Sequence, residues 1–265
     1  MRIVPAIICG LALTQPALAQ DSAAARLESS PRHHEWIVVG SGERSVHAYV
    51  AYPEVGHKAT AVLVLHENRG LTDWVRGVAD QLAEAGYLAV APDLLSGLGP
   101  GGGKTSDFPN SDAAREAISQ LEPARVMADL DAVADHAAKL PAANGKLTVA
   151  GFCWGGGQAF RYATHRPDLV AAFVFYGAFQ HTAEELARVA APVYGFYGGS
   201  DERINATIPD TERLMKEAGK TYEPVTYEGA GHGFMRSGEE PDATEPNRAA
   251  RAAAWERWKG ILKGI

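Results

Sequence analysis

Cysteine, basic clusters and long apolar runs are all scarce in this sequence. Only Cys9 and Cys153 occur among the 265 residues, and no basic run interrupts a chain whose formal net charge is −7. An acidic chain of this kind argues against nucleic acid or anionic membrane surfaces as partners. The longest apolar stretch, residues 3–13, is far shorter than the roughly 20 residues needed to cross a bilayer. No internal repeat or low-complexity linker divides the chain, so the sequence predicts one domain over residues 35–265.

The N-terminus has the pattern of a cleaved secretory signal. Arg2 precedes the apolar stretch, and Ala17, Leu18 and Ala19 precede Gln20. We therefore expect residues 1–19 to be removed, residues 20–34 to form a polar, mobile leader, and the protein to be periplasmic or secreted. Removal of Arg2 leaves 24 basic and 32 acidic residues, and Cys153 becomes the only thiol. A single thiol in an exported protein is buried, paired with another chain, or used.

From residue 60 onward, strand and helix patterns alternate. Apolar strand patterns occur at residues 60–66, 87–94, 146–152, 169–177, 191–199 and 221–229, and helical patterns lie between most of them and at residues 246–262. Residues 96–111 are rich in glycine, proline and serine and are predicted to form a loop. This alternation predicts an α/β fold with a mostly parallel, doubly wound sheet and helices on both faces.

Cys153 lies in the sequence GFCWGGG, directly after a predicted strand. This arrangement matches the nucleophile elbow G-x-S-x-G with cysteine in place of serine, in which the flanking glycines let the chain turn sharply. The amides of the following helix would point at the sulfur and lower the pKa of a thiol. The alternative is a small buried cysteine that packs the corner between strand and helix.

Asp201, in YGGSDERI, follows the predicted strand at 191–199, and His232, in EGAGHGF, follows the last predicted strand, at 221–229. A histidine on a short loop can transfer protons near neutral pH, and a carboxylate can orient it. Their order after Cys153 is the nucleophile, acid and base order of α/β-hydrolases. A structural histidine and an aspartate that caps a helix are the alternatives.

Glu67 lies at the end of the strand over residues 60–66, in the sequence HENRG. In a hydrolase of this type the loop after that strand supplies an amide of the oxyanion hole. A glutamate beside the thiol could hold or accept its proton until substrate arrives. A salt bridge with Arg69 or another neighbour is an equally good interpretation.

Together these residues resemble the dienelactone hydrolase family of α/β-hydrolases. The resemblance rests on HENRGL at 66–71, GYLAVAPDLL at 86–95, GFCWGGG at 151–157, YGGSDERI at 197–204 and GAGHGFMR at 229–236. It implies the α/β-hydrolase fold and attack on an ester or lactone carbonyl through an acyl-enzyme. It also implies the following roles: Cys153 as nucleophile, His232 as base and then acid, Asp201 orienting His232, Glu67 controlling the thiol proton, and the Trp154 and Asn68 amides as oxyanion hole.

The resemblance also implies how a substrate carboxylate would be bound. Arg236 matches a family arginine with this role, and a planar guanidinium suits a carboxylate. A second family arginine, expected shortly after the APDL block, is missing, and only Lys104 is within reach in the sequence. The expected substrate is therefore a small ester or lactone, with the dienelactone itself left open.

Two other functions fit the same scaffold. A thioesterase or acyltransferase could use the same nucleophile, and an exported binding protein could keep the fold without catalysis. No cofactor or metal is expected, because the histidines do not follow H-E-x-x-H or a comparable ligand spacing. The sequence does not indicate an oligomeric state.

Overall fold

Eight strands of the computed structural model form one sheet, and the structure describes residues 23–265. The predicted signal sequence over residues 1–19 lies outside the described residues. In spatial order the strands are β1 (His34–Ser41), β2 (Arg44–Ala51), β4 (Leu88–Pro92), β3 (Ala59–Leu65), β5 (Ala143–Phe152), β6 (Ala171–Phe175), β7 (Val193–Gly198) and β8 (Tyr222–Tyr227).

Six neighbouring strands of this sheet are parallel, from β4 to β8, whereas β2 runs antiparallel to both β1 and β4. The register aligns strand ends that carry the predicted site residues. Leu65 of β3 pairs with Gly151 of β5, and Phe152 pairs with Phe175 of β6. The mostly parallel sheet predicted from the sequence is therefore confirmed.

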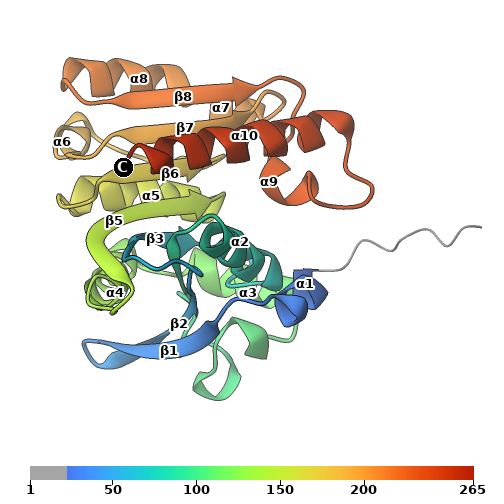
Figure 1. Cartoon of the computed structure of the whole chain (residues 1–265). Helices are drawn as coiled ribbons and strands as arrows, with labels where there is room; N and C mark the ends of the chain where they lie inside the picture. The colour runs from blue at the N-terminus through green and yellow to red at the C-terminus, as the bar shows by residue number, and fades with distance from the viewer. Residues whose placement is uncertain (1–22) are drawn as a thin grey trace, which may run out of the picture.

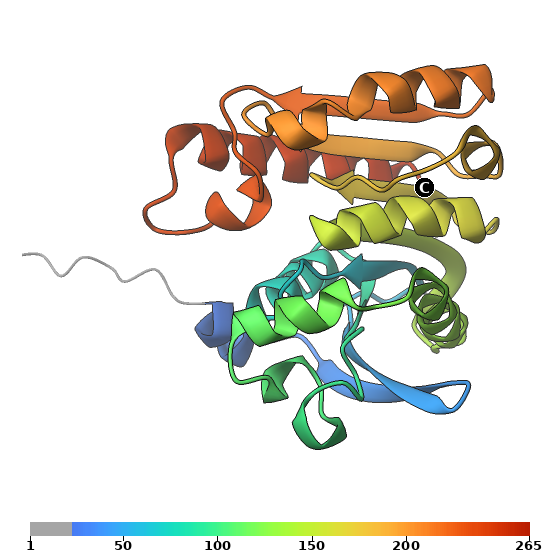
Figure 2. The same cartoon turned by 180° about the vertical axis from the view of Figure 1, so that it is seen from behind.

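Helices cover both faces of the sheet (Figures 1 and 2). One face packs against α1 (Ala23–Ser29), α2 (Asp73–Glu84) and α10 (Glu245–Lys263). The other packs against α4 (Pro123–Ala137), α5 (Trp154–His165), α6 (Ala183–Ala187) and α8 (Ile208–Glu217). Three short helices lie near the carboxyl ends of the strands: α3 (Ser111–Ser119), α7 (Glu202–Asn205) and α9 (Phe234–Ser237).

The central strands are buried on both faces, as their continuous apolar runs predict. All seven residues of β3 are buried, and so are all five of β4 and β6. Edge strand β8 is partly exposed, and its sequence is more polar than those of the central strands. Among residues 23–265, no helix is both long and apolar enough to cross a bilayer.

The predicted loop over residues 96–111 is more structured than its composition indicates. It contains 3₁₀ turns at Pro100–Gly102 and Thr105–Asp107, and α3 begins at Ser111. The buried carboxylate of Asp93 fixes this segment, because it accepts hydrogen bonds from the backbone N–H and the hydroxyl of Thr105, at 2.9 and 2.7 Å. The Asn110 side chain then caps α3 by accepting from the N–H groups of Asp112 and Ala113.

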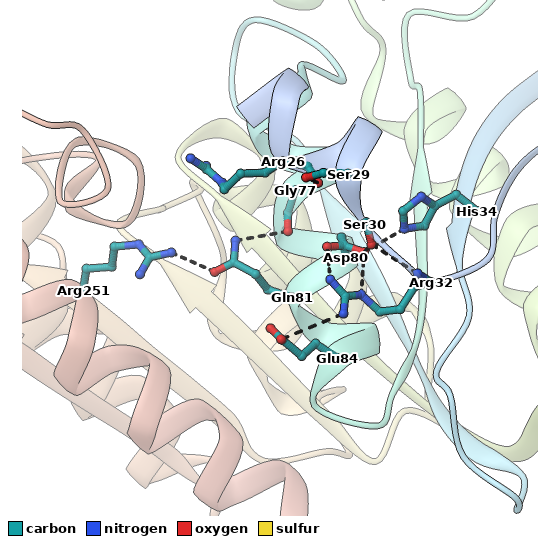
Figure 3. A network of polar contacts seen from close by, with 10 residues as sticks. All are labelled: Arg26, Ser29, Ser30, Arg32, His34, Gly77, Asp80, Gln81, Glu84 and Arg251. Atoms are coloured by element: carbon teal, nitrogen blue, oxygen red, sulfur yellow. Dashed lines mark hydrogen bonds and ion pairs between the residues drawn. The ribbon is translucent and has the colours of Figure 1, made fainter. Parts of the chain in front are cut away.

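The described part of the expected mobile leader, residues 23–34, carries α1 and a network of polar contacts (Figure 3). Asp80 of α2 accepts hydrogen bonds from Ser30 and from both Nε and Nη2 of Arg32, and its Oδ1 lies 2.7 Å from Nε2 of His34. Leu27 is buried in the same core cluster as α2. The polar side chains of residues 30–34, from which a mobile leader was predicted, are instead partners of the buried Asp80 carboxylate.

Asp80→Ala should lower the free energy of unfolding by about 3 kcal/mol, because it leaves the mostly buried Arg32 guanidinium without its main partner. Chemical denaturation measures this loss, and trypsin should cut the N-terminal segment faster. Glu84→Ala is the matched control, since Glu84 is exposed and lies 3.9 Å from Arg32. Equal stability in the two variants would contradict an anchoring role for Asp80.

Candidate active site

The sequence-predicted site residues follow the carboxyl ends of four parallel strands. Glu67 and Asn68 come after β3, Cys153 after β5, Asp201 after β7 and His232 after β8. Ligands of doubly wound sheets bind at this edge. The fold therefore brings together residues that are up to 165 positions apart in the chain.

Cys153 occupies a strained turn between β5 and α5. Its φ is 53° and its ψ is −115°, a conformation that side chains rarely adopt. A Cβ at Gly151 would lie 2.0 Å from the carbonyl oxygen of Gly155, and a Cβ at Gly155 would lie 2.4 Å from the carbonyl oxygen of His66. Both positions therefore require glycine, as the elbow pattern predicts.

Cys153, His232 and Asp201 form a continuous chain of hydrogen bonds. His232 Nε2 lies 3.1 Å from Cys153 Sγ, and His232 Nδ1 lies 2.5 Å from Asp201 Oδ2. Asp201 is buried, and although it precedes α7 its side chain makes no helix-capping hydrogen bond. The carboxylate is therefore directed at the imidazole, and the alternative of a simple capping aspartate does not describe its contacts.

The His232 imidazole is held in its charged form. Its pKa rises to about 9, because the hydrogen bond with Cys153 favours imidazolium, burial opposes it, and the hydrogen bond with Asp201 adds to the rise. The loop around it is fixed as well, since Asn247 Oδ1 accepts from the Gly231 N–H at 2.8 Å and Gly233 adopts a left-handed φ of 75°. A protonated His232 held by Asp201 can supply a proton to a leaving group at neutral pH.

Glu67 is buried and forms an ion pair with Arg236, whose Nε donates to Oε2 at 2.9 Å. The hydroxyl of Tyr176 donates to Oε1 at 3.4 Å. Glu67 therefore forms a salt bridge, which was one of the two interpretations from the sequence. Its partner is Arg236 and not the exposed Arg69. Of the described contacts of Glu67, none is a hydrogen bond to Cys153.

Trp154 and Asn68, whose amides are the predicted oxyanion hole, both line the cavity beside Cys153. Trp154 is the first residue of α5, where backbone N–H groups have no acceptor within the helix. Within residues 23–265, the Asn68 N–H donates to no backbone carbonyl. Both groups can therefore bind an oxygen that gains negative charge.

Among the aromatic rings that pack around Cys153 and His232, two belong to residues that the sequence did not predict for the site, His66 and Tyr176. His66 is fully buried, and it stacks on the Trp154 ring with 5.4 Å between ring centroids. Its Nδ1 lies 2.7 Å from the Glu67 carbonyl and its Nε2 accepts from the Leu94 N–H, while burial lowers its pKa, so the ring is neutral. His66 thereby fixes the position of the tryptophan next to Cys153.

Tyr176 is the second missed residue and follows β6. It has a φ of 39°, and its ring stands edge-on to His232 at 5.2 Å between centroids. Burial raises its pKa well above the usual value, so the hydroxyl stays protonated and can donate to Glu67. The sequence did offer one indication that Tyr176 belongs to the site, because it follows a predicted strand, as Cys153 does.

A cavity of about 340 Å³ opens beside the sulfur. Cys153, Trp154, Asn68 and Tyr176 are among the residues that line it. Arg115 of α3 and Arg203 of α7 also line it, and neither was predicted as a site residue. Sequence reasoning missed Arg115 because it left α3 unassigned, although Asn110 and the spacing of Ala114 and Ile118 signal that helix.

Lys104 and Arg236, the cations considered from the sequence, do not line this cavity. Lys104 Nζ lies 5.3 Å from the centre of the Trp36 ring and donates to Ser106. Arg236 is engaged by Glu67. Within residues 23–265, no three His, Cys, Asp or Glu side chains are grouped so that they could hold a metal ion.

Comparison with known proteins gives consistent matches. The model of the dienelactone hydrolase family matches residues 46–265. A protein of Methylorubrum extorquens assigned as a carboxymethylenebutenolidase is 33% identical over 228 residues, which cover 81% of this chain and 77% of that protein. A Bradyrhizobium protein assigned as a 2-oxo-3-(5-oxofuran-2-ylidene)propanoate lactonase is 27% identical, with 76% and 83% covered. A Klebsiella pneumoniae crystal structure assigned as a dienelactone hydrolase superposes with a TM-score of 0.77 at 27% identity, covering 88% of this chain and 99% of that one.

The elevated pKa of His232 predicts a measurable titration. NMR of the imidazole nitrogens should give a midpoint near 9, and Cys153→Ala and Asp201→Asn should each lower it toward 6.5, because each removes a contact that favours the charged ring. The stability that this pair contributes is fully present below pH 6.5 and is lost as the pH rises through about 9. An unchanged midpoint in both variants would show that these contacts do not set the pKa.

Proposed function

Because the chain belongs to the dienelactone hydrolase family, it is a carboxylic ester or lactone hydrolase, and we propose that it works through Cys153, His232 and Asp201 with an acyl-enzyme intermediate. The observation that carries this proposal is the pair of hydrogen bonds made by His232. Its Nδ1 lies 2.5 Å from Asp201 Oδ2, and its Nε2 lies 3.1 Å from Cys153 Sγ. These are the contacts that a nucleophile, its base and an orienting acid require.

In the proposed reaction, Cys153 attacks the carbonyl carbon as a thiolate whose proton is on His232 Nε2, and the C–O bond to the leaving group breaks. The proton on His232 Nε2 passes to the leaving oxygen, which leaves a thioester on Cys153 and a neutral imidazole. His232 then removes a proton from water, whose oxygen attacks the thioester carbonyl, and the sulfur leaves with the carboxylic acid as product. Asp201 keeps Nδ1 protonated and stabilises each charged form of the ring.

The tetrahedral intermediates carry a negative oxygen, and we assign its stabilisation to the backbone N–H groups of Trp154 and Asn68. Two features support this assignment: both residues line the cavity beside the sulfur, and Trp154 opens α5, whose positive dipole end faces this point. His66 contributes indirectly, because its stacking on Trp154 limits movement of that residue.

We propose that Glu67 controls the protonation of Cys153 before substrate arrives. Supporting this role, the carboxylate is buried at the end of β3 and is held by Arg236 and Tyr176, so it is fixed near the reactive groups. Binding of a substrate carboxylate by Arg236 stays a prediction from the family resemblance. An ester or lactone is the expected substrate, in keeping with the names of the relatives.

Export is also part of the proposal. The support for it is the A-x-A pattern before Gln20 and the short apolar segment. Expressed with its leader in a Gram-negative host, the protein should be recovered from the periplasm with an intact mass that lacks residues 1–19. Ala19→Arg is the control that should block cleavage, and a full-length cytoplasmic product from the native sequence would contradict export.

The nucleophile is tested with p-nitrophenyl acetate. Cys153→Ala should reduce turnover by about a thousandfold or more, and iodoacetamide should inactivate the native protein. Intact-mass analysis of the native protein, quenched early, should detect an acetyl group on Cys153. Circular dichroism of Cys153→Ala and Cys153→Ser checks that both variants remain folded.

Two outcomes would count against this assignment. Unchanged turnover in a folded Cys153→Ala variant would remove Cys153 as nucleophile. If added alcohols or amines captured most of the acyl group, the chain would be an acyltransferase on the same scaffold.

A further inference from the structure

A second cavity, of about 390 Å³, lies among α4, α5 and α6, and it shares no lining residue with the cavity beside Cys153. Its α5 residue Arg161 follows Cys153 by eight positions, which corresponds to roughly 12 Å along the helix axis. Helices α4 and α6 lie at the left of Figure 1, where the parallel strands begin, whereas α7 and α9 lie toward the strand ends. This cavity is therefore separate from the candidate active site.

Two arginines that line this cavity have no ionic partner. Arg161 belongs to α5, and Arg188 is the C-cap of α6. Within residues 23–265, no carboxylate forms an ion pair with either of them. Arg166, which follows α5 directly, differs in this respect, because it contacts three carboxylates. Two uncompensated guanidinium charges thus face one cavity in a chain whose formal net charge is −7.

Neutral groups hold both arginines in place. The guanidinium carbon of Arg161 lies 4.9 Å from the centre of the Phe179 ring, and Arg188 Nε donates to the Thr164 carbonyl at 3.4 Å. Among the described residues, the buried Nε of Arg161 has no hydrogen-bond partner. These contacts orient the two side chains beside α5 without neutralising their charge. An anion in the cavity would supply the missing partner.

The acidic groups on this face are engaged elsewhere. Glu185 lines the cavity, but its Oε2 accepts from the Thr182 N–H at 2.8 Å as part of a capping box. Although Glu185 lies one helical turn before Arg188, no ion pair joins them in the described part of the chain. His165 also lines the cavity, and its Nε2 lies 2.7 Å from Asp131 of α4. The charge left for a ligand is therefore positive, and a wall of this sign favours an anion.

We propose that this cavity is a second binding site, which takes a phosphate group between Arg161 and Arg188. A phosphate has oxygens on several sides, so two guanidinium groups can donate to it at once, whereas one arginine fork occupies both oxygens of a carboxylate. Pro123 and Ala124 of the first turn of α4 also line the cavity, and the positive end of this 15-residue helix adds to the attraction. This inference does not depend on the proposed hydrolase mechanism.

The phosphate group can come from inorganic phosphate or from a phosphate ester with a small hydrocarbon part. Met127 of α4 is buried and lines the cavity together with Pro123 and Ala124, so apolar surface lies in the same cavity as the arginines. Such surface would stabilise a hydrocarbon group attached to the phosphate. The two sources share the charged contacts and differ in this apolar contact.

Isothermal titration calorimetry of the purified protein with inorganic phosphate, at constant ionic strength, tests the site. The native protein should bind phosphate with saturation. The Kd should rise about tenfold in Arg188→Gln and in Arg161→Gln, because each variant loses a charged hydrogen bond. Arg213→Gln on α8 removes the same charge from an exposed residue outside the cavity and should keep the native Kd.

Two further ligands define what is recognised. Butyl phosphate should bind more tightly than inorganic phosphate if the natural ligand is an ester, and equal or weaker binding identifies inorganic phosphate. Acetate should bind at least about tenfold more weakly than either, because it carries one charge and cannot engage both arginines. Acetate binding as tight as that of phosphate would overturn the assignment of a phosphate site.

Arg203→Gln separates this site from the cavity beside Cys153, where Arg203 lies, and it should keep the native Kd for phosphate. A loss of affinity in Arg203→Gln but not in Arg188→Gln would place the phosphate beside Cys153 and overturn the proposal. The absence of saturable binding to the native protein would overturn it as well. Arg188 is exposed, so Arg188→Gln decides the question even if Arg161→Gln fails to fold. Turnover that survives in Cys153→Ala would contradict the proposed mechanism and leave this site unaffected.

Discussion

The close approach of backbone atoms at the turn after β5 is the constraint on which the rest of the site depends. Gly151 and Gly155 leave no room for a Cβ, since their neighbours are carbonyl oxygens of α5 and of the chain at the end of β3. Only this contact lets Cys153 project from the end of the sheet in a conformation that side chains rarely adopt. Side-chain atoms can move aside for a larger residue, but these backbone atoms are fixed by the sheet itself.

That same contact brings other parts of the site within reach. Because α5 starts directly at the turn, Trp154 presents its amide beside the sulfur and its ring to His66. Parallel neighbours β3 and β6 then place Glu67 and Tyr176 around the same point. The site is thus built mainly from residues that follow strand ends, and its precision follows from the register of the sheet.

Much of this arrangement could be predicted from the sequence. Central strands such as β3 carry continuous apolar runs, and the glycines around Cys153 have a steric meaning that can be read without coordinates. Short helices were harder to predict. Helix α7 has only four residues, and α3 has an apolar face with Ala114 and Ile118 but directly follows a glycine-rich segment that is typical of a loop. Contacts between distant charged residues, such as Glu67 with Arg236 and Asp80 with Arg32, depend on side-chain geometry that no local pattern encodes.

The four-residue helix α7 has a consequence for how this protein can diverge. Asp201 immediately precedes it and holds His232, and Arg203 projects from its first turn into the cavity. An insertion or deletion here would displace the acid of the catalytic chain together with the cavity wall. Helix α3 carries Arg115 but none of the three hydrogen-bonded residues, so variation of its length and sequence can reshape the cavity and leave Cys153, His232 and Asp201 in place.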